Sequence, residues 1–439
     1  MANTLDKKGT AGRIAAVLAF ILCIGFLFAN FYIPDSKFQS DSENLAMGSI
    51  AYGRDSASYS AFGLQFASVG KSGEEIKTVI EEYYGLDGVK YKDYTSQVGL
   101  QGYIYQTLSR ILCTGRGVSS LLSLRTVLTA VCAALTAASV MAIVYLAGRK
   151  YNGILAAAFY LTFLLSPWVA DFAQNLYWVE FTWFVPVILG MLFSLDYEKY
   201  DKPWMYVLIA LSIAVKSACG YEYISTIMLG LIMFPLVDLI MGSGADRKRL
   251  FIIIVKIGLC ALAGFFAVLI IHAFMRGDGN PIAGLKEIYE KNILCRTIIG
   301  DPDGNFTTDE NVARILRRSI EASVGEVLAL YFDFNTAVLL GFESELFVPM
   351  IVYAAVVFVL RAFRKENRWE LALFVLSFIT SISWFVLGKS HSQIHTHMNF
   401  VLWYFGFVQM CLYGILCSIA GLAKRCRQDL CAKLFAGSG

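Results

Sequence analysis

Ten apolar runs, each near the length of a membrane-crossing helix, constrain this chain more than any other feature. The hydrocarbon core of a bilayer is about 30 Å thick, so an α-helix needs about 20 apolar residues to cross it. The runs cover residues 14–33, 127–147, 152–170, 177–195, 203–221, 223–242, 250–274, 345–362, 369–388 and 397–422. The chain is 57% hydrophobic and 16% charged, whereas a soluble domain is about 45–50% apolar and about 25% charged. We therefore expect an all-α polytopic membrane protein with about ten transmembrane helices.

Lysine and arginine cluster at every second connection between these runs. The clusters are Lys7, Lys8 and Arg13; Arg149 and Lys150; Lys199 and Lys202; Arg247, Lys248 and Arg249; Arg361, Arg364, Lys365 and Arg368; and Lys424, Arg425 and Arg427. Cytoplasmic loops carry such an excess of positive charge. The pattern predicts a multi-pass protein of the cell (inner) membrane with both termini in the cytoplasm. A net charge of +3 without a basic arm argues against nucleic acid as a partner and leaves membrane lipids.

Two long segments, 34–126 and 275–344, fall on the extracytoplasmic side of a single membrane domain that covers residues 1–439. Loops longer than about 12–15 residues are uncommon unless they are functional or disordered. Three stretches within them, at 74–84, 99–112 and 311–332, have apolar residues at helical spacing. We expect these stretches to form amphipathic helices that lie at the membrane surface.

Polar and ionisable residues near the outer helix ends are the candidates for function, because such groups are costly near a membrane core. The first long segment opens with three acids, Asp35, Asp41 and Glu43. The candidates for substrate binding are Asp171, Glu180, Lys216, Glu222, Gln97, Gln101, Arg314, Arg317, Arg318, His391, His395 and His397. All of them fall on the predicted extracytoplasmic side, so we expect the active face there.

Several of these residues also allow a structural interpretation. The acids of the first segment would then be solvated loop charges, and Glu180 would pair with Lys216 inside the bundle. Arg314, Arg317 and Arg318 share one face of a predicted helix, which suits either solvent or a bound phosphate group.

Three of the four histidines fall within the stretch HSQIHTH, at the start of the last apolar run. Their HxxxHxH spacing could supply metal ligands. However, His395 and His397 do not share a helix face, and no nearby cysteine or carboxylate completes a ligand set. We therefore assign no metal site here. General acid–base work or contact with phosphate is one alternative, and a hydrogen-bonded interfacial loop is the other.

No motif of a soluble enzyme is present, since the chain has no phosphate-binding loop, no GxSxG and no HExxH. The chain also lacks an obvious internal repeat, which argues against a transporter built from two inverted halves. In a transporter or flippase, Glu180, Lys216 and Glu222 would form an intramembrane coupling site. That function is the alternative to the one implied by the resemblance below.

A first helix, a long outer segment that opens with PDSKFQSDSEN, and a second outer segment late in the chain resemble the membrane glycosyltransferases of the GT-C fold. This resemblance is one of architecture over nearly the whole chain. It implies transfer of a sugar from a polyprenyl-phosphate or polyprenyl-diphosphate carrier to a glycan or lipid acceptor, in cell-envelope assembly. It also implies that Asp41, or else Asp35 or Glu43, is the catalytic base. No cofactor is required, and a divalent cation, Mg or Mn, is left open.

Four further stretches resemble uncharacterised bacterial membrane proteins. They are YTSQVGLQG, SPWVADFAQNLYWVEFTW, KSACGYEY and HSQIHTHMNFVLWY. This second resemblance implies no activity.

Overall fold

The computed structural model describes residues 2–29, 40–68, 89–113, 117–304, 306–307, 309–332, 337–340 and 342–436. Of these residues, 79% are helical. Among them, seven helices are long and apolar enough to cross a membrane, namely α1 (Ala2–Ala29), α5 (Val118–Lys150), α11 (Ile224–Met241), α12 (Gly244–Arg276), α17 (Phe347–Phe363), α18 (Trp369–Leu387) and α21 (Phe407–Ala436). The protein is therefore a helical, multi-pass membrane protein, as its apolar runs predict.

An eighth span results if the bent pair α6 (Gly153–Leu164) and α7 (Pro167–Gln174), whose axes differ by 61°, counts as one. The bend has a local cause. Pro167 has no N–H with which to continue the α6 ladder, and Ser166 Oγ accepts from the Val169 N–H at 3.1 Å to begin α7. Two more of the predicted spans, α8 (Phe181–Leu195) and α10 (Pro203–Cys219), are apolar but only 15 and 17 residues long. Length thus supports seven to eight spans, and the count of ten stays a prediction.

The first long segment contains a mixed lobe. It consists of α2 (Ser40–Asp55), the strands β1 (Gln65–Ser68) and β2 (Lys90–Asp93), and α4 (Leu100–Leu112). The two strands pair antiparallel, with Gln65 opposite Asp93. The helix predicted at 99–112 is confirmed as α4, whereas the stretch 74–84 lies outside the described residues. The hairpin corrects the expectation of an all-α chain.

The second long segment contains α13 (Pro281–Ile288), a π-helical turn (Tyr289–Ile293), α14 (Leu294–Arg296), α15 (Glu310–Glu321), α16 (Val324–Phe332) and a 3₁₀ turn (Ser344–Leu346). The stretch 311–332 is thus two helices instead of one. Ser323 starts the second helix with reciprocal bonds: its N–H donates to Glu326 Oε2 at 2.7 Å, and the Glu326 N–H donates to Ser323 Oγ at 3.2 Å.

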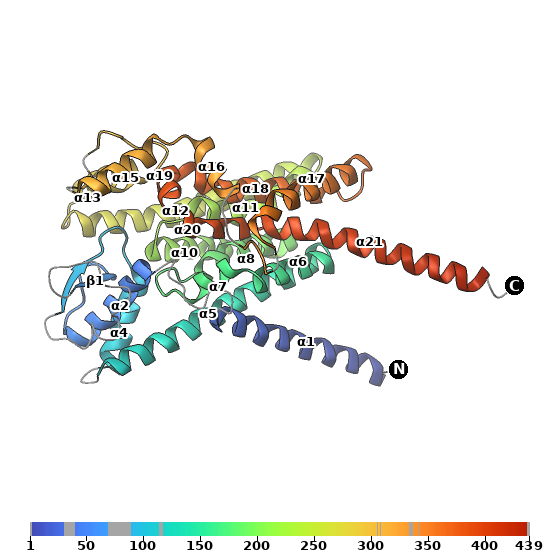
Figure 1. Cartoon of the computed structure of the whole chain (residues 1–439), viewed down its shortest axis with the longest axis horizontal. Coiled ribbons are helices and arrows are strands. Elements are labelled where there is room, and N and C mark those ends of the chain that lie inside the picture. Colours follow the sequence, from blue (N-terminus) through green and yellow to red (C-terminus); the bar gives the residue numbers. More distant parts are fainter. Residues whose placement is uncertain are drawn as a thin grey trace.

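Short elements complete the chain. They are α9 (Tyr197–Tyr200) between α8 and α10, and α19 (Lys389–Ile394), α20 (Thr396–Asn399) and a 3₁₀ turn (Phe400–Tyr404) between α18 and α21. The mixed lobe, α13, α15 and α19 lie at one end of the helix bundle, which we call the loop end. Both chain termini extend from the opposite end, which we call the terminal end (Figure 1).

Candidate functional site

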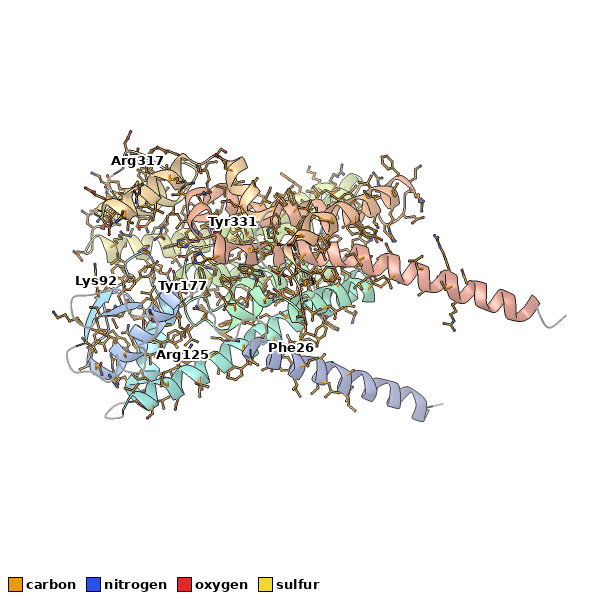
Figure 2. All side chains as sticks on the ribbon, viewed as in Figure 1. Phe26, Lys92, Arg125, Tyr177, Arg317 and Tyr331 are labelled. Carbon is orange, nitrogen blue, oxygen red and sulfur yellow. The ribbon has the colours of Figure 1, made fainter. Side chains whose placement is uncertain are left out.

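Breaks between helices bring six polar side chains into one neighbourhood, which we call the loop-end cluster. Its members are Tyr94, Tyr177, Glu222, Arg296, His391 and His395. The guanidinium of Arg296 joins them, because its charge interacts with all five of the others. Figure 2 shows Tyr177 near the junction of the mixed lobe and the bundle.

Glu222 lies in the short break between α10 and α11. Lys216 Nζ donates to Gly220 O at 2.6 Å, and Tyr223 adopts a left-handed backbone with a φ of 64°. Such backbone strain tends to gather at functional sites. Tyr177 Oη donates to Glu222 Oε1 at 3.0 Å, while Oε2 is buried and has no partner among the described residues. One oxygen of this carboxylate is therefore held in place, and the other is buried but leaves its lone pairs unbonded among the described residues.

Two glutamines dock the start of α4 on the end of α10. Gln97 Nε2 and Gln101 Nε2 both donate to Cys219 O, at 2.6 and 2.8 Å, and the Gly99 N–H donates to Ala218 O at 2.9 Å. The last carbonyls of a helix lack donors within the helix, and these groups supply them. Both amides thus position the backbone beside Glu222. Gln101 Oε1 is buried and has no partner in the described part of the chain.

Arg296, at the end of α14, is a member of the cluster that sequence reasoning missed. It is partly buried, and within the described ranges its hydrogen bonding is one long contact of 3.5 Å from Nη2 to Ser96 Oγ. It forms no ion pair with a described carboxylate. Burial by itself lowers the pKa of Arg296, but Tyr94, Glu222 and Tyr177 outweigh that effect and raise it. A fixed guanidinium with free donors suits a phosphate group.

His391 and His395 are the histidine members of the cluster, and their ring centroids are 4.5 Å apart. Asn399 orients the buried His391, because its Nδ2 lies 3.4 Å from His391 Nδ1 while its Oδ1 accepts from Tyr223 Oη at 2.7 Å. Burial, with neighbouring positive groups, lowers the pKa of His391 well below its ordinary value. Burial, His397 and Arg296 lower the pKa of His395 to about 4. Both rings are thus neutral near pH 7 and act as hydrogen-bonding groups.

His397 extends the stack of rings, with its centroid 5.7 Å from that of His395. Across the described ranges, no group of three or more His, Cys, Asp or Glu side chains is arranged to hold a metal ion. The roles considered for the three histidines therefore stay predictions.

The three arginines of α15 are exposed, although α15 itself packs against α19 and α14. Arg314 Nη2 donates to Asn311 Oδ1 at 3.0 Å, and Arg317 Nε donates to Pro302 O at 3.3 Å. Figure 2 shows Arg317 at the outer margin of the loop end, apart from Tyr177. The helical spacing of these three arginines made them candidates in the sequence. No other arginine lies at helical spacing from Arg296, so the sequence did not indicate it.

Of the three acids that open the first segment, Glu43 is the one whose side chain is described, and it serves the fold. Its Oε1 accepts from Arg125 Nε at 2.6 Å, and its Oε2 accepts from the Leu176 N–H at 3.2 Å. These bonds join α2 to α5 and to the connection between α7 and α8. Asp35 and the side chain of Asp41 lie outside the described residues, so the catalytic role expected of them stays a prediction.

The expected pairing of Glu180 with Lys216 is wrong. Lys216 interacts with Glu222 and donates to the backbone at Gly220, whereas the acid that acts on Glu180 is Asp171. Glu180 lies directly before α8, whereas Lys216 lies in the last turn of α10. Lys216 therefore reaches the break after α10 instead of Glu180. The three residues of the transporter alternative therefore do not form one group.

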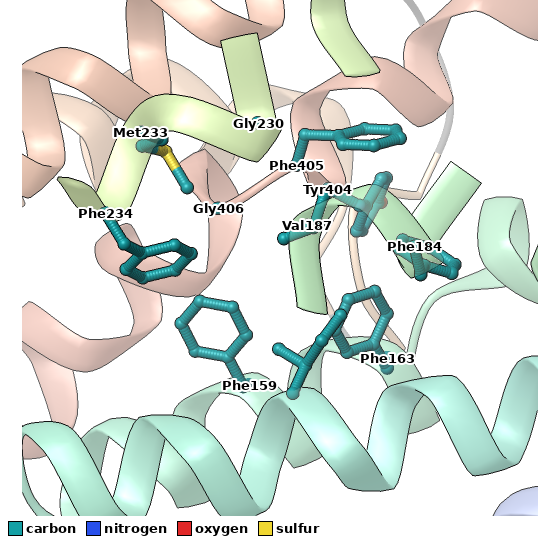
Figure 3. Close-up of a pocket in the computed structure, with 11 residues that line it drawn as sticks. Phe159, Phe163, Phe184, Val187, Gly230, Met233, Phe234, Tyr404, Phe405 and Gly406 are labelled. Atoms are coloured by element: carbon teal, nitrogen blue, oxygen red, sulfur yellow. The ribbon is translucent and has the colours of Figure 1, made fainter. Parts of the chain in front are cut away.

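Two hollows between the helices are apolar and carry no chemistry of their own. Figure 3 shows the first, between α5, α6, α8 and α11 and the turn that precedes α21. Its lining includes Phe159, Phe163, Phe184, Val187 and Phe405. The second is a surface groove between α8 and α10, lined by Phe181, Thr182, Val185, Leu189, Leu208, Leu211, Ser212 and Val215. The polar loop-end cluster is therefore the better candidate for a reaction site.

No protein-family model matches this chain, and no curated protein or solved structure matches it either. The function therefore has to be inferred from the geometry and chemistry of the loop-end cluster.

Proposed function

We propose that this protein is a membrane glycosyltransferase that moves a sugar from a polyprenyl-phosphate or polyprenyl-diphosphate carrier to a glycan or lipid acceptor. Its active site is the loop-end cluster, on the extracytoplasmic face. The arrangement around Arg296 carries the proposal. A guanidinium without an ion pair in the described part of the chain interacts with Glu222, a carboxylate that has one open oxygen, and with two neutral histidines.

The chemistry needs a fixed cation and a base. The carrier departs as an anionic phosphate, and a preorganised cation offsets the charge that develops in the transition state. Arg296 supplies that cation, and the two histidines supply further hydrogen bonds. A base must also take the proton of the acceptor hydroxyl as its oxygen attacks the anomeric carbon. Glu222 Oε2 suits this role because Tyr177 holds Oε1 and leaves Oε2 open.

Glu222 thus becomes the favoured base in place of an acid of the first segment. Glu43 has both oxygens bonded, to Arg125 and to the Leu176 N–H. Asp41, and after it Asp35, is the alternative base under the GT-C resemblance. The fold proposed with this activity is GT-C-like, with α8 and α10 as short spans that bring the count to ten.

The terminal end of the bundle favours a transferase over a transporter. There, Asp238 accepts from Lys150 Nζ at 2.8 Å and from Tyr197 Oη at 2.7 Å. A second network has Glu370 Oε1 accepting from Arg361 Nη2 at 3.0 Å and from Tyr413 Oη at 2.8 Å. A transporter has to open at this end and would break such partly buried bonds. A transferase that opens at the loop end alone leaves them intact.

Transfer of label from radiolabelled polyprenyl-phosphate sugars by the protein in nanodiscs tests the proposal. We expect transfer by the wild type and a fall in kcat of about 10²–10⁴-fold for Glu222→Gln, since that is the usual contribution of a general base. Arg317→Ala is the control and should leave the rate unchanged, because that side chain is exposed and apart from the cluster. Full activity of Glu222→Gln beside an inactive Asp41→Asn would move the base to the first segment. Absence of transfer by folded wild type from every lipid-linked sugar would refute the proposal.

A further inference from the structure

Glu180 is a buried acid that the proposed mechanism does not use. It stands between α7 and α8, and its side chain is 0% exposed. Neither carboxylate oxygen has a hydrogen-bond partner among the described residues, and no described lysine or arginine forms an ion pair with it. Buried carboxylates in proteins are normally hydrogen-bonded or paired. The protonation state of Glu180 therefore needs a physical account.

No described positive charge acts on Glu180. Within the described ranges, the charge that acts on it is that of Asp171 on α7, which is also buried. On α1, the Cys23 thiol interacts with Glu180. The helices that pack on α8, which are α5, α9, α10 and α11, contribute no described charge that acts on Glu180. Close by in the chain, Trp183 is fully buried, and its Nε1 also lacks a described partner.

An ionised carboxylate costs several kcal/mol at a buried site that offers it no partner. A second carboxylate nearby adds repulsion, so two such acids do not readily ionise together. A bound proton removes both the desolvation cost and the repulsion, because a neutral carboxylic acid carries no charge.

We infer that Glu180 is a proton-binding site in the membrane bundle, where it is held as a neutral carboxylic acid with Asp171 as its acidic neighbour. This site is separate from the loop-end cluster, and the inference does not rest on the proposed transferase activity. The ligand is a single proton, which is kept at a pH where an exposed glutamate has lost it.

Infrared spectroscopy of the full-length protein in nanodiscs tests the inference. At pH 7 and above, the wild type should show the carbonyl stretch of a protonated carboxylic acid, and Glu180→Gln should lose that band. Asp238→Asn is the matched control. Asp238 is a partly buried acid that forms an ion pair with Lys150, so its removal should leave the band in place. A wild-type spectrum without the band, or a band that persists in Glu180→Gln, would overturn the inference.

Stability gives a second readout with a defined sign. A neutral Glu180 binds its proton more tightly in the folded than in the unfolded chain. Folding stability should therefore fall as the pH rises through the range in which the unfolded chain loses this proton and the folded chain keeps it. Glu180→Gln, which is neutral at every pH, should remove that slope. Equal slopes in the wild type and in Glu180→Gln would count against the site. If the variant fails to fold, mapping of the wild type after dicyclohexylcarbodiimide treatment replaces it: an adduct at Glu180 supports the inference, and the infrared band of the wild type still decides it.

Discussion

At the scale of single residues, hydrogen-bond partners distinguish an acid that stabilises the fold from one that can take part in a reaction. Glu43 and Glu222 are both 8% exposed. Glu43 has one oxygen on Arg125 and the other on a backbone N–H, whereas Glu222 has one oxygen held and one open among the described residues. A carboxylate with both oxygens bonded has fewer lone-pair sites left for a substrate proton. The same criterion separates Arg296 from the bonded, exposed Arg314 and Arg317.

Replacement of Glu43 by alanine should lower stability and leave the chemistry of the folded protein intact. The substitution removes the ion pair with Arg125 and leaves the buried Leu176 N–H unsatisfied, which typically costs about 1–3 kcal/mol. Thermal unfolding in detergent, with transfer activity normalised to folded protein, measures both effects. A loss of normalised activity at unchanged stability would instead place Glu43 in the reaction.

Acid should destabilise the loop end through His395. Its pKa falls from 6.5 to about 4 on folding, chiefly because the ring is buried. Between those values the unfolded chain binds more protons, so stability rises with pH through this window and is complete above it. Unfolding temperatures measured from about pH 4 to pH 7 should show that slope, and His395→Asn should reduce it. An unchanged slope in the variant would show that other groups control the acid response.

At the scale of elements, the cluster is built from helix ends. Tyr177 lies between α7 and α8, Glu222 between α10 and α11, and Arg296 at the end of α14. Helix ends leave backbone groups without intrahelical partners. Non-helical backbone within a membrane is tolerated only where it is buried in protein or lines a cavity. The helix breaks at the loop end must be surrounded by protein or line a cavity. The same surroundings can also hold polar side chains.

Gly99 is the turn on which the docking of α4 depends. Its φ is 77°, and a Cβ there would lie 2.8 Å from the Leu64 backbone nitrogen. Gly99→Ala should therefore cost at least about 1–2 kcal/mol of stability and reduce transfer activity by moving Gln97 and Gln101. Gly12→Ala is the control, because a Cβ at Gly12 meets nothing within 4 Å. Unfolding temperatures of the two variants side by side make the comparison; equal stability would refute a strained turn at Gly99.

At the scale of the whole molecule, the two ends of the bundle differ in kind. The loop end carries a guanidinium and a carboxylate oxygen without close partners in the described part of the chain. The terminal end carries paired networks around Asp238 and Glu370. The basic clusters of the sequence gather at the terminal end, as at Arg149 and Lys150, which predicts that this end is cytoplasmic.

Cysteine labelling should reveal that orientation. Cys426 is exposed near the end of α21, at the terminal end. In a Cys431→Ser background, a membrane-impermeant maleimide should label Cys426 only after cells are permeabilised. Ser58→Cys, at an exposed position of the mixed lobe, should be labelled in intact cells. The reverse pattern would invert the proposed topology and put the loop-end cluster in the cytoplasm.

The sequence by itself determined the helical membrane class, the position of α4 and three of the six residues of the cluster, namely Glu222, His391 and His395. These are local properties, because the free energy of membrane insertion sums over adjacent residues. Only the tertiary structure decided the hairpin, the bend before α7, the pairing of Glu43 and the place of Arg296. Those depend on contacts between distant positions, such as the bond from Gln97 to Cys219 across 122 residues. Whether a carboxylate is bonded or open is decided by packing, and periodicity along the chain carries no record of it.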